Sequence, residues 1–168
     1  MSQMNCNKNT DSYCNVKYDP CYDKGSKPCK DSDTKVEFRY DERTPATPTP
    51  IPVTGVELLE VEFNRVARGN RVWLSGVISI NNNAAAVATI TIRIVKDSPN
   101  IAPTTIYTLF VEVDAEGRDD QQAIPFSHVD VNVNNLFDVE YSVIVSASIA
   151  GVVTQGPNTL TALRFENK

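Results

Sequence analysis

The sequence predicts an all-β protein: a two-sheet β-sandwich, of the jelly-roll type with about eight strands, that carries an extended cysteine-containing N-terminal arm. Apolar side chains recur at every second position through most of the chain, which is the pattern of half-buried strands. No segment repeats apolar residues at the spacing of a helix. The 168 residues suit one domain with an appendage, and all four cysteines lie in a polar stretch at the start of the chain.

The arm, residues 1–34, has almost no aliphatic side chains. Such a segment cannot bury enough apolar surface to fold alone, so cross-links, metal or a partner must order it. The candidates for disulfides between subunits are Cys6, Cys14, Cys21 and Cys29. Three pairings within one chain, and a zinc site of four thiolates, remain alternatives. In an extended arm the thiols lie about 25 Å apart, which favours a ladder of bonds between arms.

Residues 35–54 are predicted to be a lone strand followed by a spacer. In residues 35–41 apolar and charged side chains alternate, and four prolines within eight residues then predict a stiff, polyproline-like spacer. The spacer is expected to hold the strand away from the core. The strand either folds back as the first strand of its own domain or pairs with the sheet edge of a neighbouring subunit, through Val36, Phe38 and Tyr40.

Residues 55–168 are predicted to be the sandwich core, with a bulge near Leu58 where the apolar phase changes. Turns are expected at residues 68–70, at residues 81–83 and near Gly151 and Gly156, and a loop between Pro99 and Pro103. The apolar faces of the strands are expected to form the core without any disulfide. The predicted strands span residues 56–63, 72–80, 88–94, 107–113, 129–133, 139–149 and 160–165.

An immunoglobulin-type sandwich is the alternative fold, but it would often show a core disulfide and a buried tryptophan. The single tryptophan, Trp73, is out of phase with the apolar residues on either side of it. It is therefore predicted to face outward, and an exposed tryptophan in an assembling protein is typical of a subunit contact.

No catalytic site, metal site or cofactor is predicted. The only histidine, His128, lies near Ser127 and Asp130, and His128 and Asp130 are expected to point outward together as a surface pair. No nucleophile turn of the hydrolase kind is present. Residues 114–120 are rich in acids, but they lack the ligand order of a calcium-binding EF-hand, so a solvated turn is favoured.

The charge distribution disfavours nucleic acid as a partner. Residues 1–54 hold eight basic and eight acidic side chains, whereas residues 55–168 hold eight basic and thirteen acidic ones, which gives the net charge of −5. No stretch approaches the ~18 consecutive apolar residues of a membrane span. The first residues contain no apolar segment of a secretory signal peptide, so none is expected.

The layout of a cysteine-containing connector, a short linker and a small jelly roll resembles subunits of bacterial endospore appendages and related spore-surface proteins. The core segments IYTLFVEVDAEG, IPFSHVDV and YSVIVSASIAG are similar in character to such domains. The resemblance implies subunits that stack into fibres and connectors that lock neighbours by disulfides. It also implies synthesis in the mother cell without a signal peptide, and exposure on the spore surface after lysis.

In the subunits that this chain resembles, cysteines of the connector pair with cysteines in the core of a neighbour. Residues 55–168 of this chain contain no cysteine, so a covalent lock must run from arm to arm. We therefore expect a structural, non-enzymatic subunit of an extracellular or spore-surface fibre. Its partners would be copies of itself and other spore-surface proteins. The alternatives are a glycan- or calcium-binding module, with its site near residues 114–120, and a trimeric fibre-tip adhesin domain.

Overall fold

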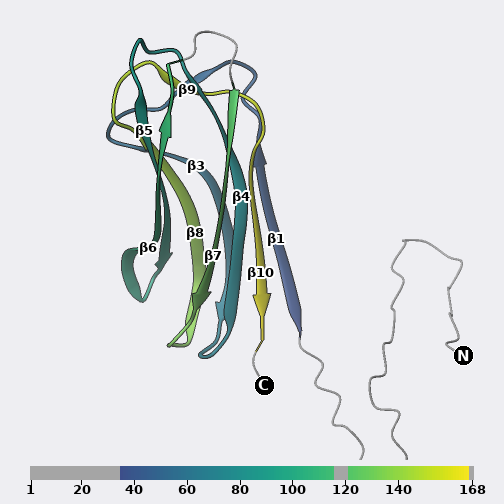
Figure 1. Ribbon diagram of the computed structural model, residues 1–168. Helices are drawn as coiled ribbons and strands as arrows, with labels where there is room; N and C mark the ends of the chain where they lie inside the picture. Colours follow the sequence, from purple (N-terminus) through teal and green to yellow (C-terminus); the bar gives the residue numbers. More distant parts are fainter. Residues whose placement is uncertain (1–34, 116–120, 167–168) are drawn as a thin grey trace, which may run out of the picture. The chain divides into compact units, whose positions relative to one another are not determined.

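The computed structural model describes residues 35–115 and 121–166 of the chain, so the four cysteines of the arm lie outside the described residues. The described residues contain ten strands and no helix, in two antiparallel sheets, which confirms the predicted all-β sandwich (Figure 1). The strands are β1 (Val36–Arg43), β2 (Thr49–Pro50), β3 (Val56–Val66), β4 (Arg71–Asn82), β5 (Ala88–Ser98), β6 (Ile101–Val113), β7 (Gln121–Val131), β8 (Leu136–Ala147), β9 (Val152–Thr154) and β10 (Asn158–Phe165).

The eight long strands pair in the order of a jelly roll. One sheet runs β1-β10-β4-β7, with the short strands β9 and β2 continuing beside β4, and the other runs β3-β8-β5-β6. Every connection between consecutive long strands crosses from one sheet to the other, except the turn between β5 and β6. The two layers can be followed in Figure 1, where β6, β5 and β8 lie to the left of β4, β10 and β1.

The core lies between the sheets and is built from the alternating apolar residues. Side chains of β3, β4, β5, β8 and β10 point inward at every second position, as the sequence predicts. The ring of Phe63 meets that of Tyr141 edge to face, with centroids 6.2 Å apart. The predicted bulge near Leu58 is confirmed by a register shift between Glu57 and Leu59.

Several predicted boundaries need correction. The turn predicted at residues 81–83 begins later, because β4 continues to Asn82. The Asn82 side chain itself shapes the turn that follows, since it accepts from the backbone nitrogen of Ala84 at 3.0 Å. The predicted loop after Pro99 is shorter, because β6 begins at Ile101. The strand predicted for residues 129–133 begins earlier and forms the end of β7.

The strand in residues 35–41 is not held away from the sandwich. As β1, it pairs along its length with β10 of the same chain, from Val36 opposite Phe165 to Arg43 opposite Asn158. The proline-rich segment is not a free spacer, because Ile51 within it is buried and its backbone nitrogen donates to the backbone of β9. The first of the two alternatives for this strand is therefore the one that the chain adopts.

The two ends of the sandwich differ. The β3–β4 and β7–β8 turns lie at the end where β1 begins and β10 ends, and longer connections lie at the opposite end (Figure 1). Lys35, the first described residue, therefore lies at the end with the short turns. Within the described part of the chain, no helix has the length and apolar character needed to cross a membrane.

Candidate interaction surface

Over residues 36–41, β1 exposes its apolar side chains and turns its charged ones inward. Val36, Phe38 and Tyr40 are 52%, 56% and 49% exposed, whereas the alternating residues Glu37 and Arg39 are half-buried. This is the reverse of an ordinary sandwich strand, whose apolar face lies against the core. Because apolar surface gains free energy when it is removed from water, an exposed stripe of this kind indicates a contact surface.

The inward charges of β1 bind the edge strand of the opposite sheet. Nε of Arg39 donates a hydrogen bond to the backbone oxygen of Glu62, at 2.9 Å. The backbone nitrogen of Glu60 in turn donates to Oδ2 of Asp41, at 3.0 Å. These bonds satisfy backbone groups at the edge of β3 that an approaching strand would otherwise pair with. Arg39 and Asp41 are thus held on the inner face of β1, which leaves Phe38 and Tyr40 on its outer face.

The end of β7 has the same inverted polarity, and the predicted outward pair of His128 and Asp130 is wrong. Both side chains point into the sandwich, where Asp130 accepts from Lys96 Nζ at 2.6 Å and from the Tyr141 hydroxyl at 2.8 Å. The His128 ring lies against Tyr107, with centroids 5.4 Å apart. Burial, followed by the charge of Asp130 and the hydrogen bond to it, raises the pKa of Tyr141, so its phenol stays protonated and donates.

The inward position of Asp130 determines where the neighbouring valines lie. Because successive side chains of a strand point to opposite faces, Val129 and Val131 must face outward, and they are 49% and 55% exposed. The expectation that this apolar run contributes to the core is therefore wrong. The physical reason is that Lys96, on the facing sheet, has its carboxylate partner on this strand.

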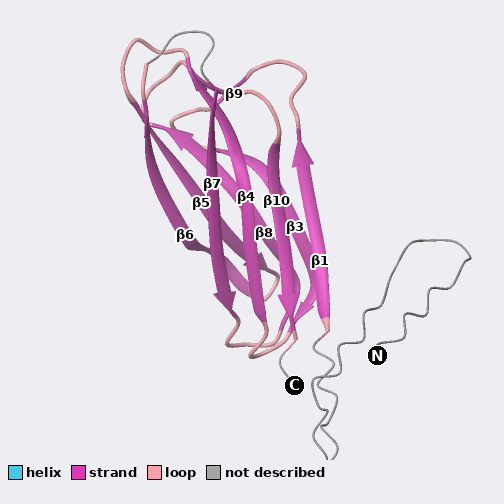
Figure 2. Cartoon of the chain, turned by 45° about the vertical axis from the view of Figure 1, so that its right-hand side comes forward, coloured by secondary structure: helices cyan, strands magenta, loops and turns pink. Residues whose placement is uncertain are grey.

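The cross-strand register joins these residues into continuous rows. Phe38 lies opposite Leu163 of β10, Leu163 lies opposite Trp73 of β4, and Trp73 lies opposite Val129 of β7. The four strands lie side by side in Figure 2. We call the outward apolar residues near the short-turn end of this sheet the apolar face: Val36, Phe38, Tyr40, Trp73, Val129, Val131, Leu163 and Phe165.

Trp73 lies at the centre of the apolar face. It is 40% exposed, whereas Val72 and Leu74 on either side are fully buried, which confirms its predicted outward orientation. Its indole nitrogen donates to the hydroxyl of Ser127 on β7, at 2.8 Å. The polar atom of the ring is thus satisfied within the sheet, and the apolar ring surface is left for a partner.

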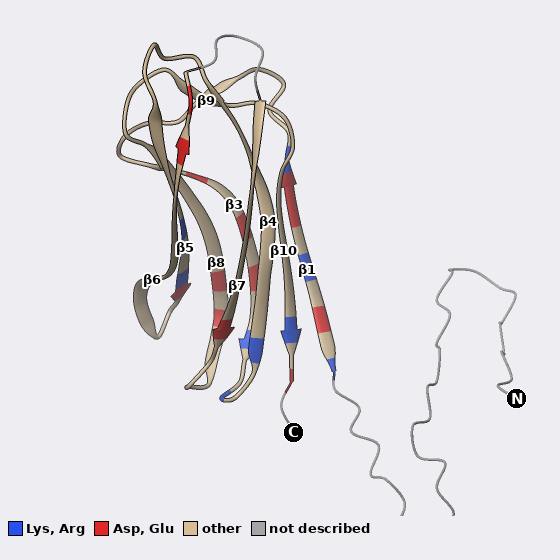
Figure 3. Ribbon diagram, in the orientation of Figure 1, with Lys and Arg blue, Asp and Glu red and all other residues tan. Residues whose placement is uncertain are grey.

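Charge is distributed unevenly between the two outer surfaces. Among the outward positions of β1, β10, β4 and β7 in the described residues, Glu42 and Arg71 are the charged ones. The outer surface of the other sheet instead carries several carboxylates on β3 and β8. Figure 3 shows the contrast: β4 is tan over most of its length, whereas β3 and β8 carry red segments.

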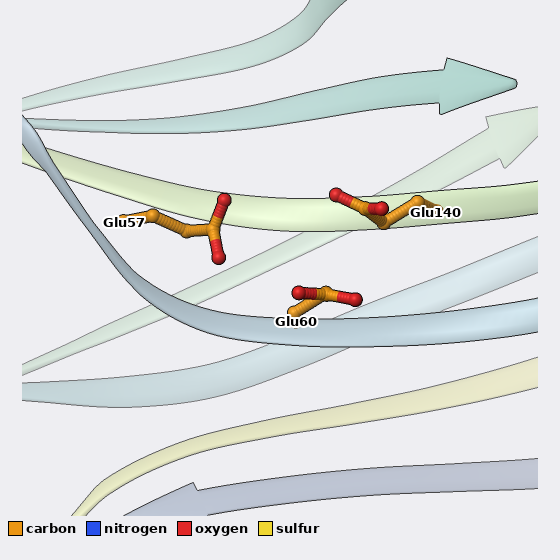
Figure 4. A group of neighbouring side chains, drawn as sticks. All are labelled: Glu57, Glu60 and Glu140. Carbon is orange, nitrogen blue, oxygen red and sulfur yellow. The ribbon is translucent and has the colours of Figure 1, made fainter.

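We call the outer surface of the sheet β3-β8-β5-β6 the acidic surface. Three of its carboxylates come together at its edge. Glu57 and Glu60 lie on β3 and Glu140 lies on β8, with oxygen atoms within 4.8 Å of one another (Figure 4). Desolvation, followed by the charges of Glu140 and Glu57, raises the pKa of Glu60. Carboxylates at this spacing can share a divalent cation. No second feature among the described residues marks a ligand here, so we interpret the cluster as a source of repulsion.

Replacing Glu60 by glutamine is expected to stabilise the fold at pH 7 by about 0.5 kcal/mol, the size of a cross-strand like-charge term. The folded pKa of Glu60 is raised, so the repulsion is absent below its ordinary value of 4.5 and develops as the pH rises above it. The advantage of Glu60→Gln should therefore disappear near pH 4 in urea unfolding curves. Glu112→Gln, on the exposed face of β6, is the control, and an equal gain there would contradict the interpretation.

The structure places only some of the predicted site residues. The strand-pairing candidates lie on β1 and belong to the apolar face, whereas the cysteines lie outside the described residues, as do residues 116–120 of the acidic segment. Sequence reasoning missed Leu163 and Phe165 as surface residues. Nothing in the alternation of a strand indicates which of its two faces is the outer one, so only the pairing with β1 and β4 could reveal them.

No protein-family model matches the chain, and no curated protein matches it. The chain is similar to the crystal structure of the infectious bursal disease virus VP2 subviral particle, with a TM-score of 0.49 and 14% identity, over 92% of this chain and 37% of that one. A structure of the Gx strain of that virus gives 0.46 and 10%, over 80% of this chain and 36% of that one. The chain thus spans little more than a third of these proteins, and at TM-scores below 0.5 we draw no functional conclusion from the similarity.

Proposed function

We propose that this chain is a self-associating structural subunit whose apolar face packs against a second copy. The observation that supports it most is the row from Phe38 through Leu163 and Trp73 to Val129, which crosses all four strands of one sheet. Interface centres are enriched in aromatic side chains and depleted of charge, as this row is. Packing the face against a like face would bury the stripe that the inverted strands leave in water.

The charge distribution of the chain favours a second copy of the chain as the partner of the apolar face. The chain has a net charge of −5, and the acidic surface carries Glu57, Glu60, Glu62 and Glu140, so two copies repel each other through that surface. The apolar face carries almost no charge, so two copies can approach there without that cost. Like faces that meet in this way form a two-fold pair.

The arm supplies the second part of the proposal. Residues 1–34 join the sandwich at Lys35, directly before Val36 of the apolar face, so a pair of subunits would start its two arms beside the same interface. Disulfides between arms, from Cys6, Cys14, Cys21 and Cys29, would then link pairs into a fibre. Disulfides persist in oxidising surroundings, which supports a location outside the cell. The resemblance to subunits of endospore appendages favours the spore surface as that location.

Assembly of the purified full chain tests the proposal. We expect light scattering and electron microscopy to show fibres without reductant and pairs of subunits with reductant. A non-reducing gel should show covalent multimers that collapse to one band on reduction. The variant with all four cysteines changed to serine should still pair but should never form the covalent multimers.

Three outcomes would contradict parts of the proposal. A monomer at all concentrations, with and without reductant, would contradict self-association. Pairs without covalent multimers would contradict only the role of the arm. A discrete trimer would instead favour the fibre-tip alternative.

A further inference from the structure

A lysine, an aspartate and an asparagine meet inside the sandwich at its short-turn end. Nζ of Lys96, on β5, lies 2.6 Å from Oδ2 of Asp130 and 2.9 Å from Oδ1 of Asn132, just beyond the end of β7. Lys96 is 6% exposed and Asn132 is 3% exposed. The fully buried Tyr141 donates to the same oxygen of Asp130. A primary amine, an amide carbonyl and a carboxylate are therefore in contact in a site from which water is largely excluded.

The amide of Asn132 is held in one orientation. Its Nδ2 donates to the backbone oxygens of Val66, at 2.8 Å, and Ala67, at 3.4 Å, and also to that of Asn134. An amide nitrogen has two hydrogens, so three acceptors are one more than it needs. A nitrogen that is leaving as an ammonium-like group has three hydrogens, and this set of carbonyls matches that number.

We propose that Lys96 and Asn132 react to form an amide bond between their side chains, with Asp130 as the acid–base catalyst and ammonia as the leaving group. The bond would join Nζ of Lys96 to Cγ of Asn132. It would connect β5 of one sheet to the segment that follows β7 in the other. The proposal does not depend on self-association.

The reaction balances without any other reactant. The ammonium of Lys96 gives one proton to the carboxylate of Asp130, and the freed lone pair of Nζ attacks Cγ of Asn132. A second proton of Nζ passes to Nδ2, the Cγ–Nδ2 bond breaks, and ammonia leaves. The ammonia takes the proton held by Asp130, so ammonium departs and the carboxylate is restored.

Rigid positioning favours this reaction over the slow reaction of an amine with an amide in water. The backbone of Asn132 is fixed on both sides, because its nitrogen donates to Asn70 at 3.0 Å and its oxygen accepts from Gly69 at 2.8 Å. Held groups of this kind react with effective concentrations of about 10⁵ M or more when they are well oriented. Exclusion of water also strengthens the interaction of Asp130 with the charges that develop.

The intact mass of the denatured full chain tests the proposal directly. We expect it to be lower than the mass of the sequence by one ammonia after prolonged incubation of the folded protein. A protease digest should contain a branched peptide that joins the segment of Lys96 to that of Asn132. The variants Lys96→Met, Asn132→Ala and Asp130→Asn should keep the full mass, and Lys35→Arg, an exposed lysine, should still lose ammonia.

The mass of the unchanged chain decides the proposal, because that mass does not depend on how well any variant folds. Full mass for the unchanged chain would overturn it. Loss of ammonia without the branched peptide would also overturn it, since ring closure at an asparagine elsewhere releases ammonia too. Loss of ammonia that persists in Lys96→Met would have the same meaning.

Discussion

Phe38→Asp is expected to keep the sandwich folded and to weaken self-association by about 2 kcal/mol or more, which is about a 30-fold loss of affinity. Phe38 is 56% exposed on β1, so the fold does not depend on burying its ring. In the proposed pair the new carboxylate would be buried against the apolar face of the second copy without a partner, which costs more than the lost contact. Sedimentation or light scattering across a concentration series measures the change.

Phe110→Asp is the matched control. Phe110 is also an exposed phenylalanine on a strand, 67% exposed, but it lies on β6 of the other sheet. The same chemical change there should leave association as it is, while circular dichroism and thermal unfolding show both variants folded. Equal loss of association in both variants would mean that general repulsion, and not the apolar face, is responsible.

Gly76→Ala is expected to destabilise the fold by about 3 kcal/mol, the upper part of the range for overpacked cores. Gly76 lies at an inward position of β4, and a methyl group there would meet Cζ of Phe126 at 2.7 Å and come still closer to the backbone oxygen of Thr159. Where the site has room for a methyl group, replacement of glycine by alanine instead stabilises the folded protein by about 0.4–1 kcal/mol. The sign of the effect in urea unfolding therefore tests the packing of β4 against β7 and β10.

The neighbouring Ser75→Ala serves as the control for the same strand. Ser75 lies on the outer side of β4, so its change should stay within about 0.5 kcal/mol. If Gly76→Ala were as stable as the unchanged chain, β4 and β10 could not approach as closely as the structure shows. The predicted cost depends only on the sandwich and not on any partner.

The fold class follows from the sequence because burial in most strands is decided locally. Ile90, Ile92 and Ile94 alternate with polar residues, and all three are fully buried. Gly69 and Gly151 have φ angles of 83° and 99°, the left-handed conformations that make glycine a good predictor of a turn. In these elements the local pattern and the tertiary structure agree, so periodicity alone is enough.

The candidate site could not be predicted in the same way. β1 and the end of β7 alternate as regularly as the core strands, but their apolar residues face solvent. Alternation shows that a strand has two faces, and only the opposite sheet decides which face is inside. Here Glu60 and Glu62 offer backbone groups to Arg39 and Asp41. Lys96 likewise requires Asp130 on the inner side of β7.

Residues that are close together in the chain are enough to predict the all-β sandwich, its main strands, the bulge near Leu58 and the outward orientation of Trp73. Contacts between distant strands place β1 in its own sheet and turn the apolar residues of β1 and of the end of β7 outward. Such contacts also align Phe38, Leu163, Trp73 and Val129 in one row and bring Lys96 to Asp130 and Asn132. The reason is physical: these contacts join strands distant in sequence, and the partner of a charged side chain determines which face of a strand is buried.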